Sequence, residues 1–263
     1  IVYLLYKITM NITGIVCVNN NYAIGYDNRL LYTLKKDMQF FKHTTVYTCD
    51  NNKKNAVLMG YHTYTSIPTK YFPLEKRVNI IISDTHYKEI KKTIKDNNLK
   101  EVFVFRNILN AIHFCNIDNA IETLFVIGGS SIYDFFMKKY LFTNIYITEI
   151  TNPKTNIGNV FFNNKNILDL NYIKRYIHTH VEENCLQHID NQTYNVTYSI
   201  YEHKAIFVEK YSTYIHTQSH EQNYLTQLQY VLDHGEIRQT RNAETLSCFG
   251  IRMEFDLTLG FPL

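Results

Sequence analysis

The feature that most constrains the fold of this chain is a series of short apolar runs separated by segments with helical spacing. Runs that are apolar at nearly every position predict strands buried on both faces of a sheet. Apolar residues three and four apart between the runs predict helices. We expect strands at residues 12–18, 55–59, 78–82, 101–105, 123–127 and 144–150, and helices at residues 33–46, 61–66, 108–115 and, after Gly129, through Tyr140.

Strands that alternate with helices predict an α/β domain with a mostly parallel central sheet. Residues 193–201 alternate between apolar and polar side chains, which is typical of a half-exposed antiparallel strand and predicts an antiparallel C-terminal edge. A polar stretch at residues 205–220 indicates a linker. Residues 224–235 then have helical spacing again, so residues 221–263 are expected to open a further domain.

Composition excludes several classes of protein. The chain has 263 residues, of which 45% are hydrophobic and 19% charged, as in ordinary globular domains. A net charge of +3 argues against nucleic acid as a partner. Five scattered cysteines without C-x-x-C spacing predict reduced thiols and a cytoplasmic protein.

The first residues do not indicate a membrane segment. Residues 1–8 are apolar but too few to span a bilayer. Because the chain does not begin with Met, we expect Met10 to be the true start and residues 1–9 to be an upstream artefact.

Asp37 is the first candidate for chemistry. Thr33 is expected to cap a helix in which Leu34, Met38 and Phe41 form one apolar stripe. Asp37 falls on this stripe, and Asp is seldom buried without a partner. Burial raises the pKa of a carboxyl group, which suits a group that holds and transfers a proton. The alternative is an acid placed in the first turn because the helix dipole favours it there.

Two predicted strands end in Gly and are followed at once by a helix. These turns are Gly60-Tyr61-His62-Thr63 and Gly128-Gly129-Ser130-Ser131. Ligands of parallel sheets bind beyond the carboxyl ends of the strands, Gly lets them approach the backbone, and helix N–H groups attract anions. Two such turns suit the phosphates of a dinucleotide. The alternative is an ordinary tight strand-to-helix turn, since the G-x-G-x-x-G motif is absent.

Arg77 stands directly before the predicted strand at residues 78–82. A guanidinium fixed at the start of a strand can bind a carboxylate with two hydrogen bonds, although a solvated loop arginine is commoner. His178-Thr179-His180 has no third ligand at metal-site spacing, so we expect a surface segment and no metal site.

These pieces form a series of motifs in a recognisable order. The motifs are Gly14-Ile-Val-Cys-Val, Tyr22-Ala-Ile-Gly25, Leu30-Leu-Tyr-Thr-Leu-Lys-Lys-Asp37, Phe40-Phe-Lys, Val57-Leu-Met-Gly-Tyr-His-Thr-Tyr64, Pro73-Leu-Glu-Lys-Arg77, Ile80-Ile-Ile-Ser83, Val126-Ile-Gly-Gly-Ser-Ser-Ile-Tyr133 and Tyr146-Ile-Thr-Glu149. Their order and spacing resemble those of the dihydrofolate reductase family over residues 10–204. The resemblance implies a three-layer α/β/α fold and NADPH-dependent reduction of 7,8-dihydrofolate to 5,6,7,8-tetrahydrofolate, in one-carbon metabolism and dTMP supply.

The resemblance also assigns roles around the substrate. Asp37 matches the family's active-site acid, which hydrogen-bonds the pterin and supports protonation at N5. Thr148 matches the hydroxyl that bonds this acid and the pterin through water, and Arg77 matches the clamp on the glutamate carboxylate. The residues that match the walls around the pterin and the benzoyl ring are Ile15, Cys17, Met38, Phe41, Ile67 and Leu74.

An NADPH site is implied at the glycine turns and the neighbouring strand ends. Residues 22–31 match the mobile loop that closes on the nicotinamide, and the Gly128–Gly129 peptide bond is expected to be cis as in the family. Ile127 and Tyr133 match residues beside the nicotinamide. The full set is Ala23, Ile24, Gly25, Gly60, His62, Thr63, Ser83, Arg106, Ile127, Gly128, Gly129, Ser130, Ser131 and Tyr133.

The chain departs from the family's pattern at three places. Leu31-Tyr32 replaces Pro-Trp, and Tyr32 can still place a hydroxyl near the pterin, so we include it among the catalytic candidates. Tyr61 replaces a Lys or Arg beside the cofactor phosphate. Asp84 stands where a base or small polar residue is common, and a carboxylate there repels a 2′-phosphate. His62 and Arg106 are left to favour NADPH over NADH.

Residues 221–263 resemble the opening of thymidylate synthase. The motifs are Tyr224-Leu-Thr-Gln-Leu, Thr245-Leu-Ser-Cys-Phe-Gly250, Met253-Glu-Phe-Asp-Leu257 and Gly260-Phe-Pro-Leu263, and Arg241 matches an arginine for the dUMP phosphate. Cys248 does not match the synthase nucleophile. A segment this short does not form its own core. We therefore expect a truncated bifunctional reductase–synthase without synthase activity, with a monomeric reductase domain and any synthase supplied by a companion chain.

Two hypotheses about function remain. The first is an active dihydrofolate reductase, indicated by Asp37, Thr148, Arg77 and the glycine pair standing in order. The second is a non-catalytic remnant that binds folate or nothing, indicated by the three departures and the short tail. Steady turnover would exclude the second hypothesis.

Overall fold

The structure is a computed structural model, and it describes residues 10–151, 158–163, 165, 168, 171–183, 193–204, 236–239 and 244–247. The chain divides into two units, Ile1–Lys204 and Ala205–Leu263. Within the described residues, no helix has both the length and the apolar character needed to cross a membrane.

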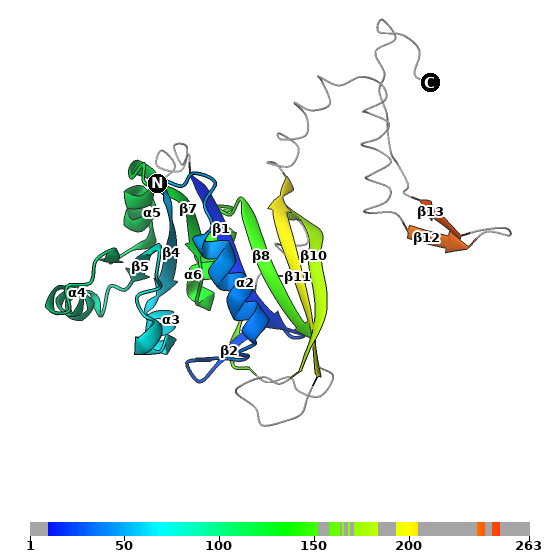
Figure 1. Cartoon of the computed structure of the whole chain (residues 1–263), viewed down its shortest axis with the longest axis horizontal. Helices are drawn as coiled ribbons and strands as arrows, with labels where there is room; N and C mark the ends of the chain where they lie inside the picture. Colours follow the sequence, from blue (N-terminus) through cyan, green and yellow to red (C-terminus); the bar gives the residue numbers. More distant parts are fainter. Residues whose placement is uncertain are drawn as a thin grey trace, which may run out of the picture. The chain divides into compact units, whose positions relative to one another are not determined.

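The first unit is built on an eight-stranded sheet with the order β10-β11-β8-β1-β7-β4-β5-β6 (Figure 1). The six strands from β8 to β6 pair in parallel, whereas β11 pairs antiparallel with β8, and β10 with β11. This arrangement confirms the predicted parallel sheet with an antiparallel C-terminal edge. The strands are β1 Asn11–Asn19, β4 Lys54–Gly60, β5 Arg77–Ile82, β6 Val102–Phe105, β7 Ile121–Val126, β8 Asn144–Thr151, β10 Tyr172–Glu183 and β11 Thr193–His203.

Helices cover both faces of this sheet, as the alternating side chains of β4 demonstrate. Ala56 and Leu58 belong to an apolar cluster that includes residues of α5 and α6. Val57 and Met59 point to the opposite face and belong to a cluster bordered by α2 and α4. The predicted three-layer α/β/α arrangement is therefore confirmed. The helices are α2 Lys35–Val46, α3 Tyr61–Ser66, α4 Tyr87–Asp96, α5 Ile108–Ile117 and α6 Ser130–Lys138, with a short 3-10 helix η1 at Thr69–Tyr71.

A small second sheet lies in the first unit, in the order β3-β2-β9. Strands β2 Ala23–Tyr26 and β3 Arg29–Leu30 form a hairpin within the segment that matches the mobile loop, and β9 Val160–Phe161 pairs with β2. This sheet gives residues 22–31 a defined structure that the polar composition of the segment does not reveal.

The predicted start of the Asp37 helix is wrong. Helix α2 begins at Lys35 with Leu34 as its N-cap residue, and the side chain of Leu34 makes no capping hydrogen bond, so the cap lies one residue later than predicted. Leu34 takes this position because its side chain is buried, at 1% exposure, in an apolar cluster beside the helix. Helix α4 and strand β10 have no counterpart in the prediction.

The second unit contains one described hairpin, in which β12 Glu236–Gln239 pairs antiparallel with β13 Glu244–Ser247. The predicted linker at residues 205–220, the helix at residues 224–235, Arg241 and Cys248 lie outside the described residues. The predicted domain boundaries remain a prediction.

Candidate active site

The cofactor candidates and Thr148 lie towards the carboxyl ends of the parallel strands, where ligands of such sheets bind, whereas Arg77 stands at the start of β5. Strands β1 and β8 run side by side, and the pairing register sets Cys17 opposite Thr148. Going outward on the other side of β1, strands β7, β4, β5 and β6 end near Gly128, Gly60, Ser83 and Arg106, respectively. The topology therefore brings substrate and cofactor candidates that are far apart in the sequence to one edge of the sheet.

Asp37 is the third residue of α2 and the acidic residue of its first turn. Its side chain is half-buried, so both proposed explanations for an acid at this position agree with its place in the helix. The predicted apolar stripe is wrong at Met38, which is 39% exposed, whereas Phe41 is half-buried and packs against the core on the α2 side.

Thr148 is buried on β8, with 2% of its surface exposed, opposite Cys17 on one side and Tyr198 of β11 on the other. Tyr198 belongs to the same apolar cluster as Tyr32, and Cys17 packs against that cluster. The structure therefore brings the candidate hydroxyl of Thr148 and the candidate Tyr32 to one region beside the N-terminus of α2.

Phe40 connects the two apolar clusters on the α2 side of the sheet. It packs against both, and its ring lies 4.4 Å from that of Tyr198, measured between centroids. The remaining wall candidates are Ile15, Phe41, Ile67 and Leu74, which are all in or against the cluster centred on β4 and β5. Tyr198 is a residue that the sequence analysis missed, because its strand is distant in sequence and it carries no motif.

Arg77 is the first residue of β5 and is buried, with 4% of its surface exposed. Its Nε donates to the backbone oxygen of Glu75 over 3.0 Å, and its Nη1 donates to Oγ1 of Thr45 over 2.7 Å. Burial lowers the pKa of Arg77 to about 10, so the guanidinium is charged at neutral pH.

No ion-pair partner for Arg77 exists within the described part of the chain. Buried charges are ordinarily paired, because an isolated one is costly to remove from water. Because Arg77 is buried, the alternative of a solvated loop arginine is excluded. A buried guanidinium without a protein carboxylate is suited to binding the carboxylate of a ligand.

The two glycine turns lie against each other. The backbone N–H of Gly60 donates to the carbonyl oxygen of Gly128 over 2.8 Å. Gly128 has a φ of +116°, and a Cβ placed there would lie 3.3 Å from a ring carbon of Tyr133 and 3.4 Å from Oγ1 of Thr63. The Gly128–Gly129 peptide bond is cis, as the resemblance implies. A side chain at residue 128 would fill the space beside Thr63, so glycine keeps the backbone open to a close ligand.

Helix α6 begins directly after this turn, with Gly129 as its N-cap residue, no side-chain cap and no acid in the first turn. Such a helix start is favourable for a phosphate group. Ser130 is half-buried, and Ser131 is exposed. Helix α3, which follows Gly60, is only six residues long and carries His62 exposed to solvent.

The residues at the ends of β5 and β6 are already engaged with each other. Nη1 of Arg106 lies 2.6 Å from Oδ1 of Asp84, and both side chains are exposed. The ring of Tyr61 is stacked on that of His86, with centroids 3.8 Å apart. Oγ of Ser83 accepts a hydrogen bond from the backbone N–H of His86. Asp84 therefore engages Arg106, one of the two basic groups expected to favour a 2′-phosphate. The ring of Tyr61 also lies beside that of the other group, His62, with centroids 5.8 Å apart.

The segment that matches the mobile loop is held at two places. Nδ2 of Asn28 donates to Oγ1 of Thr65 in α3 over 3.2 Å. Asp27 exchanges two hydrogen bonds with Asn159, the residue directly before β9, which pairs with β2 in the small sheet. Ala23, Ile24 and Gly25 all lie in β2.

The described residues contain no group of His, Cys, Asp and Glu that could hold a metal ion. His178, Thr179 and His180 lie on β10, and their side chains are outside the described part. Within the part of the chain that the structure describes, Cys17, Cys49 and Cys115 are not joined in disulfides.

Comparison with known proteins identifies the same segment. Residues 11–203 match the family model of dihydrofolate reductase. A dihydrofolate reductase of Heliothis virescens is 38% identical over 144 residues, which cover 55% of this chain and 74% of that protein.

Two longer matches extend beyond this segment. Bifunctional dihydrofolate reductase-thymidylate synthase 1 of Arabidopsis thaliana is 28% identical over 267 residues, covering 95% of this chain and 49% of that protein. The bifunctional dihydrofolate reductase-thymidylate synthase of Paramecium tetraurelia is 29% identical over 251 residues, covering 95% of this chain and 46% of that protein. The chain therefore spans about half the length of these bifunctional relatives.

Proposed function

Because the chain belongs to the dihydrofolate reductase family, we propose that it reduces 7,8-dihydrofolate to 5,6,7,8-tetrahydrofolate with NADPH, and so supplies tetrahydrofolate for one-carbon metabolism. The observation that carries this proposal is the pair of charged groups on one side of the sheet. Asp37 opens α2, and the buried Arg77, which has no carboxylate partner among the described residues, contacts Thr45 near the end of the same helix. One group suits the proton transfer and the other suits the glutamate carboxylate of the substrate.

Residues on the α2 side of the sheet bind the substrate and supply the proton. Asp37 hydrogen-bonds the pterin and supports protonation at N5. Thr148 and Tyr32 supply hydroxyl groups on the same side, and Ile15, Cys17, Met38, Phe41, Ile67 and Leu74 enclose the pterin and benzoyl rings. Apolar walls exclude water and hold the acceptor carbon in a fixed orientation, which removes much of the entropic barrier to transfer.

The residues at the glycine turns fit the cofactor. When bound, NADPH supplies the hydride. Gly128 and Gly129 leave the backbone open, and Gly60 lets the side chain of Ile132 pack closely against the neighbouring turn. The start of α6 and Thr63 suit the phosphates, and Ile127 and Tyr133 border the nicotinamide. Ser83, His62 and Arg106 are the candidates for the adenosine side.

The proposal extends to residues 221–263 and to the state of the protein in the cell. Both bifunctional relatives match over 95% of this chain, which supports assigning residues 221–263 to the start of a thymidylate synthase part. We also expect a monomeric reductase domain and a cytoplasmic location.

The direct test is the absorbance of the reduced nicotinamide band during incubation of the full chain with dihydrofolate and either NADPH or NADH. Oxidation that requires both protein and dihydrofolate supports the reductase. A cooperatively melting protein that oxidises neither cofactor would contradict it and favour the non-catalytic remnant.

A further inference from the structure

Two buried polar residues outside the predicted site make direct contacts to the Arg77 segment. Thr45 is fully buried in α2, and Asn79 is 1% exposed in β5. Thr has a low helix propensity, and Asn has a low strand propensity. The secondary structure that carries each residue therefore does not explain its presence. Buried polar side chains are ordinarily hydrogen-bonded, and both of these residues bond to Arg77.

Thr45 fixes the end of the arginine side chain. Its hydroxyl donates to the backbone oxygen of Phe41 over 2.7 Å and accepts from Nη1 of Arg77 over 2.7 Å. A hydroxyl has a single hydrogen. Because the helix backbone takes that hydrogen, the lone pairs of Oγ1 are left to accept from the guanidinium.

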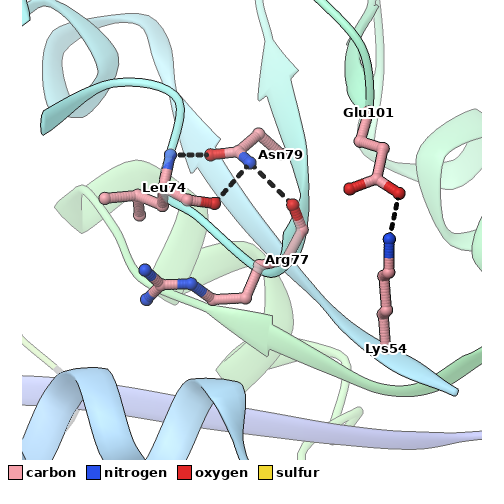
Figure 2. Close-up of polar contacts among 5 residues, drawn as sticks. All are labelled: Lys54, Leu74, Arg77, Asn79 and Glu101. Carbon is pink, nitrogen blue, oxygen red and sulfur yellow. Dashed lines mark hydrogen bonds and ion pairs between the residues drawn. The ribbon is translucent and has the colours of Figure 1, made fainter.

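Asn79 fixes the turn that leads into Arg77, as Figure 2 shows. Its Oδ1 accepts from the backbone N–H of Leu74 over 2.9 Å. Its Nδ2 donates to the backbone oxygens of Leu74, over 3.0 Å, and of Arg77, over 2.8 Å. One amide group therefore ties both ends of the turn to β5 and holds the backbone from which the Arg77 side chain extends.

We propose that Thr45 and Asn79 are positioning residues that aim the Arg77 guanidinium at the carboxylate of the ligand. Thr45 orients the plane of the guanidinium, and Asn79 fixes the backbone of Arg77 from which the side chain extends. This inference rests on the proposed function, in which Arg77 binds the glutamate carboxylate of the folate. Its consequence is that both residues affect recognition of that carboxylate without touching the substrate.

The test compares two ligands that differ only in charge at the glutamate. Calorimetry measures the affinity of the full chain for folate and for folate diamide, in which both glutamate carboxylates are carboxamides. Thr45→Val removes the hydroxyl at nearly constant volume and is expected to reduce the ratio of the two affinities about tenfold, the effect of a hydrogen bond to a charged group. Thr45→Ser keeps a hydroxyl and is expected to restore most of the ratio.

A matched control and a second variant separate positioning from structure. Thr44→Val makes the same chemical change one residue away and is expected to leave the ratio unchanged. Asn79→Ser is expected to lower the ratio and to raise KM for dihydrofolate more than it lowers kcat. In an Arg77→Leu background, Thr45→Val is expected to have no further effect on the ratio, because the two residues then share no interaction.

Each outcome bears on one proposal. If the unmodified chain prefers folate to its diamide, Arg77→Leu abolishes the preference and Thr45→Val leaves it intact, the positioning inference is wrong and the proposed function stands. A chain that binds folate and its diamide equally would contradict the assignment of Arg77 and this inference with it. A chain that binds neither ligand contradicts the proposed function itself. Equal losses of affinity for both ligands in Thr45→Val would show a merely structural role.

Discussion

Tyr133 in α6 donates a hydrogen bond from its phenol oxygen to the backbone oxygen of Ile15 in β1, over 2.7 Å. Both residues are buried. Burial raises the pKa of Tyr133 well above its usual value, so the phenol stays protonated and the bond persists over the physiological pH range. The contact joins a residue proposed to lie beside the nicotinamide to one proposed to line the pterin site.

Tyr133→Phe is therefore expected to destabilise the protein. It leaves the carbonyl of Ile15 buried without this donor, which costs about 1–3 kcal/mol. Urea unfolding followed by circular dichroism measures the loss. Tyr140→Phe, at an exposed position, is the control and should leave the midpoint unchanged. Equal midpoints for Tyr133→Phe and the unmodified chain would contradict the assigned bond.

Asp84→Asn is expected to tighten NADPH binding. The carboxylate of Asp84 engages Arg106 over 2.6 Å and repels a 2′-phosphate, and the amide does neither as strongly. We expect about a tenfold gain for NADPH, equivalent to about 1.4 kcal/mol, and little change for NADH, measured by fluorescence titration. Asp96→Asn makes the same charge change at an exposed site and serves as the control. An equal gain for both cofactors would argue against this assignment.

The preference for folate over its diamide should follow the protonation of Arg77. Burial lowers the pKa of this guanidinium to about 10, so below that pH it is charged and attracts the ligand carboxylate. The affinity ratio is expected to be constant between about pH 6 and pH 9, because carboxylates are ionised throughout this range. It should fall as the pH rises through about 10. A ratio that changes near pH 7 instead would point to a different cationic group.

Thr65→Val is expected to loosen the segment that matches the mobile loop. It removes the acceptor for Nδ2 of Asn28, an exposed contact. Such a bond contributes about 0.5–1.5 kcal/mol, so NADPH should dissociate several-fold faster in stopped-flow experiments. Thr65→Ser retains the hydroxyl and should dissociate at the original rate. Unchanged dissociation in Thr65→Val would mean that this contact does not hold the loop over the cofactor.

Much of the sheet could be predicted from the sequence because its strands are covered on both faces. Helix α3 was predicted with its observed bounds, Tyr61–Ser66, since Gly60 and Pro68 mark its two ends. Helix α4 escaped prediction because only Ile90 of its residues is buried and the rest are mostly charged or polar. Strand β10 lies at the edge of the sheet and lacks a continuous apolar run.

The site was harder to predict where it depends on tertiary contacts. Sequence patterns identified Asp37, Arg77 and the glycine pair, but gave no reason to select Thr45 or Asn79. A single threonine in a helix and a single asparagine in a strand acquire a role only when the chain folds and places them against Arg77. Met38 was expected in a buried stripe because the spacing is helical, but spacing cannot tell which side of a helix another element covers.

The measurement that tests the account most directly is the pH dependence of NADPH oxidation by Asp37→Asn with dihydrofolate as substrate. If Asp37 supports protonation at N5, turnover by Asp37→Asn at neutral pH should fall by about 10²–10⁴-fold. It should recover in part as the pH is lowered, because the solution then supplies the proton. Asp96→Asn, which removes the same charge from an exposed site, should keep the rate and pH profile of the unmodified chain. Turnover by Asp37→Asn equal to that of the unmodified chain at neutral pH would contradict the assignment of Asp37 and the proposed mechanism.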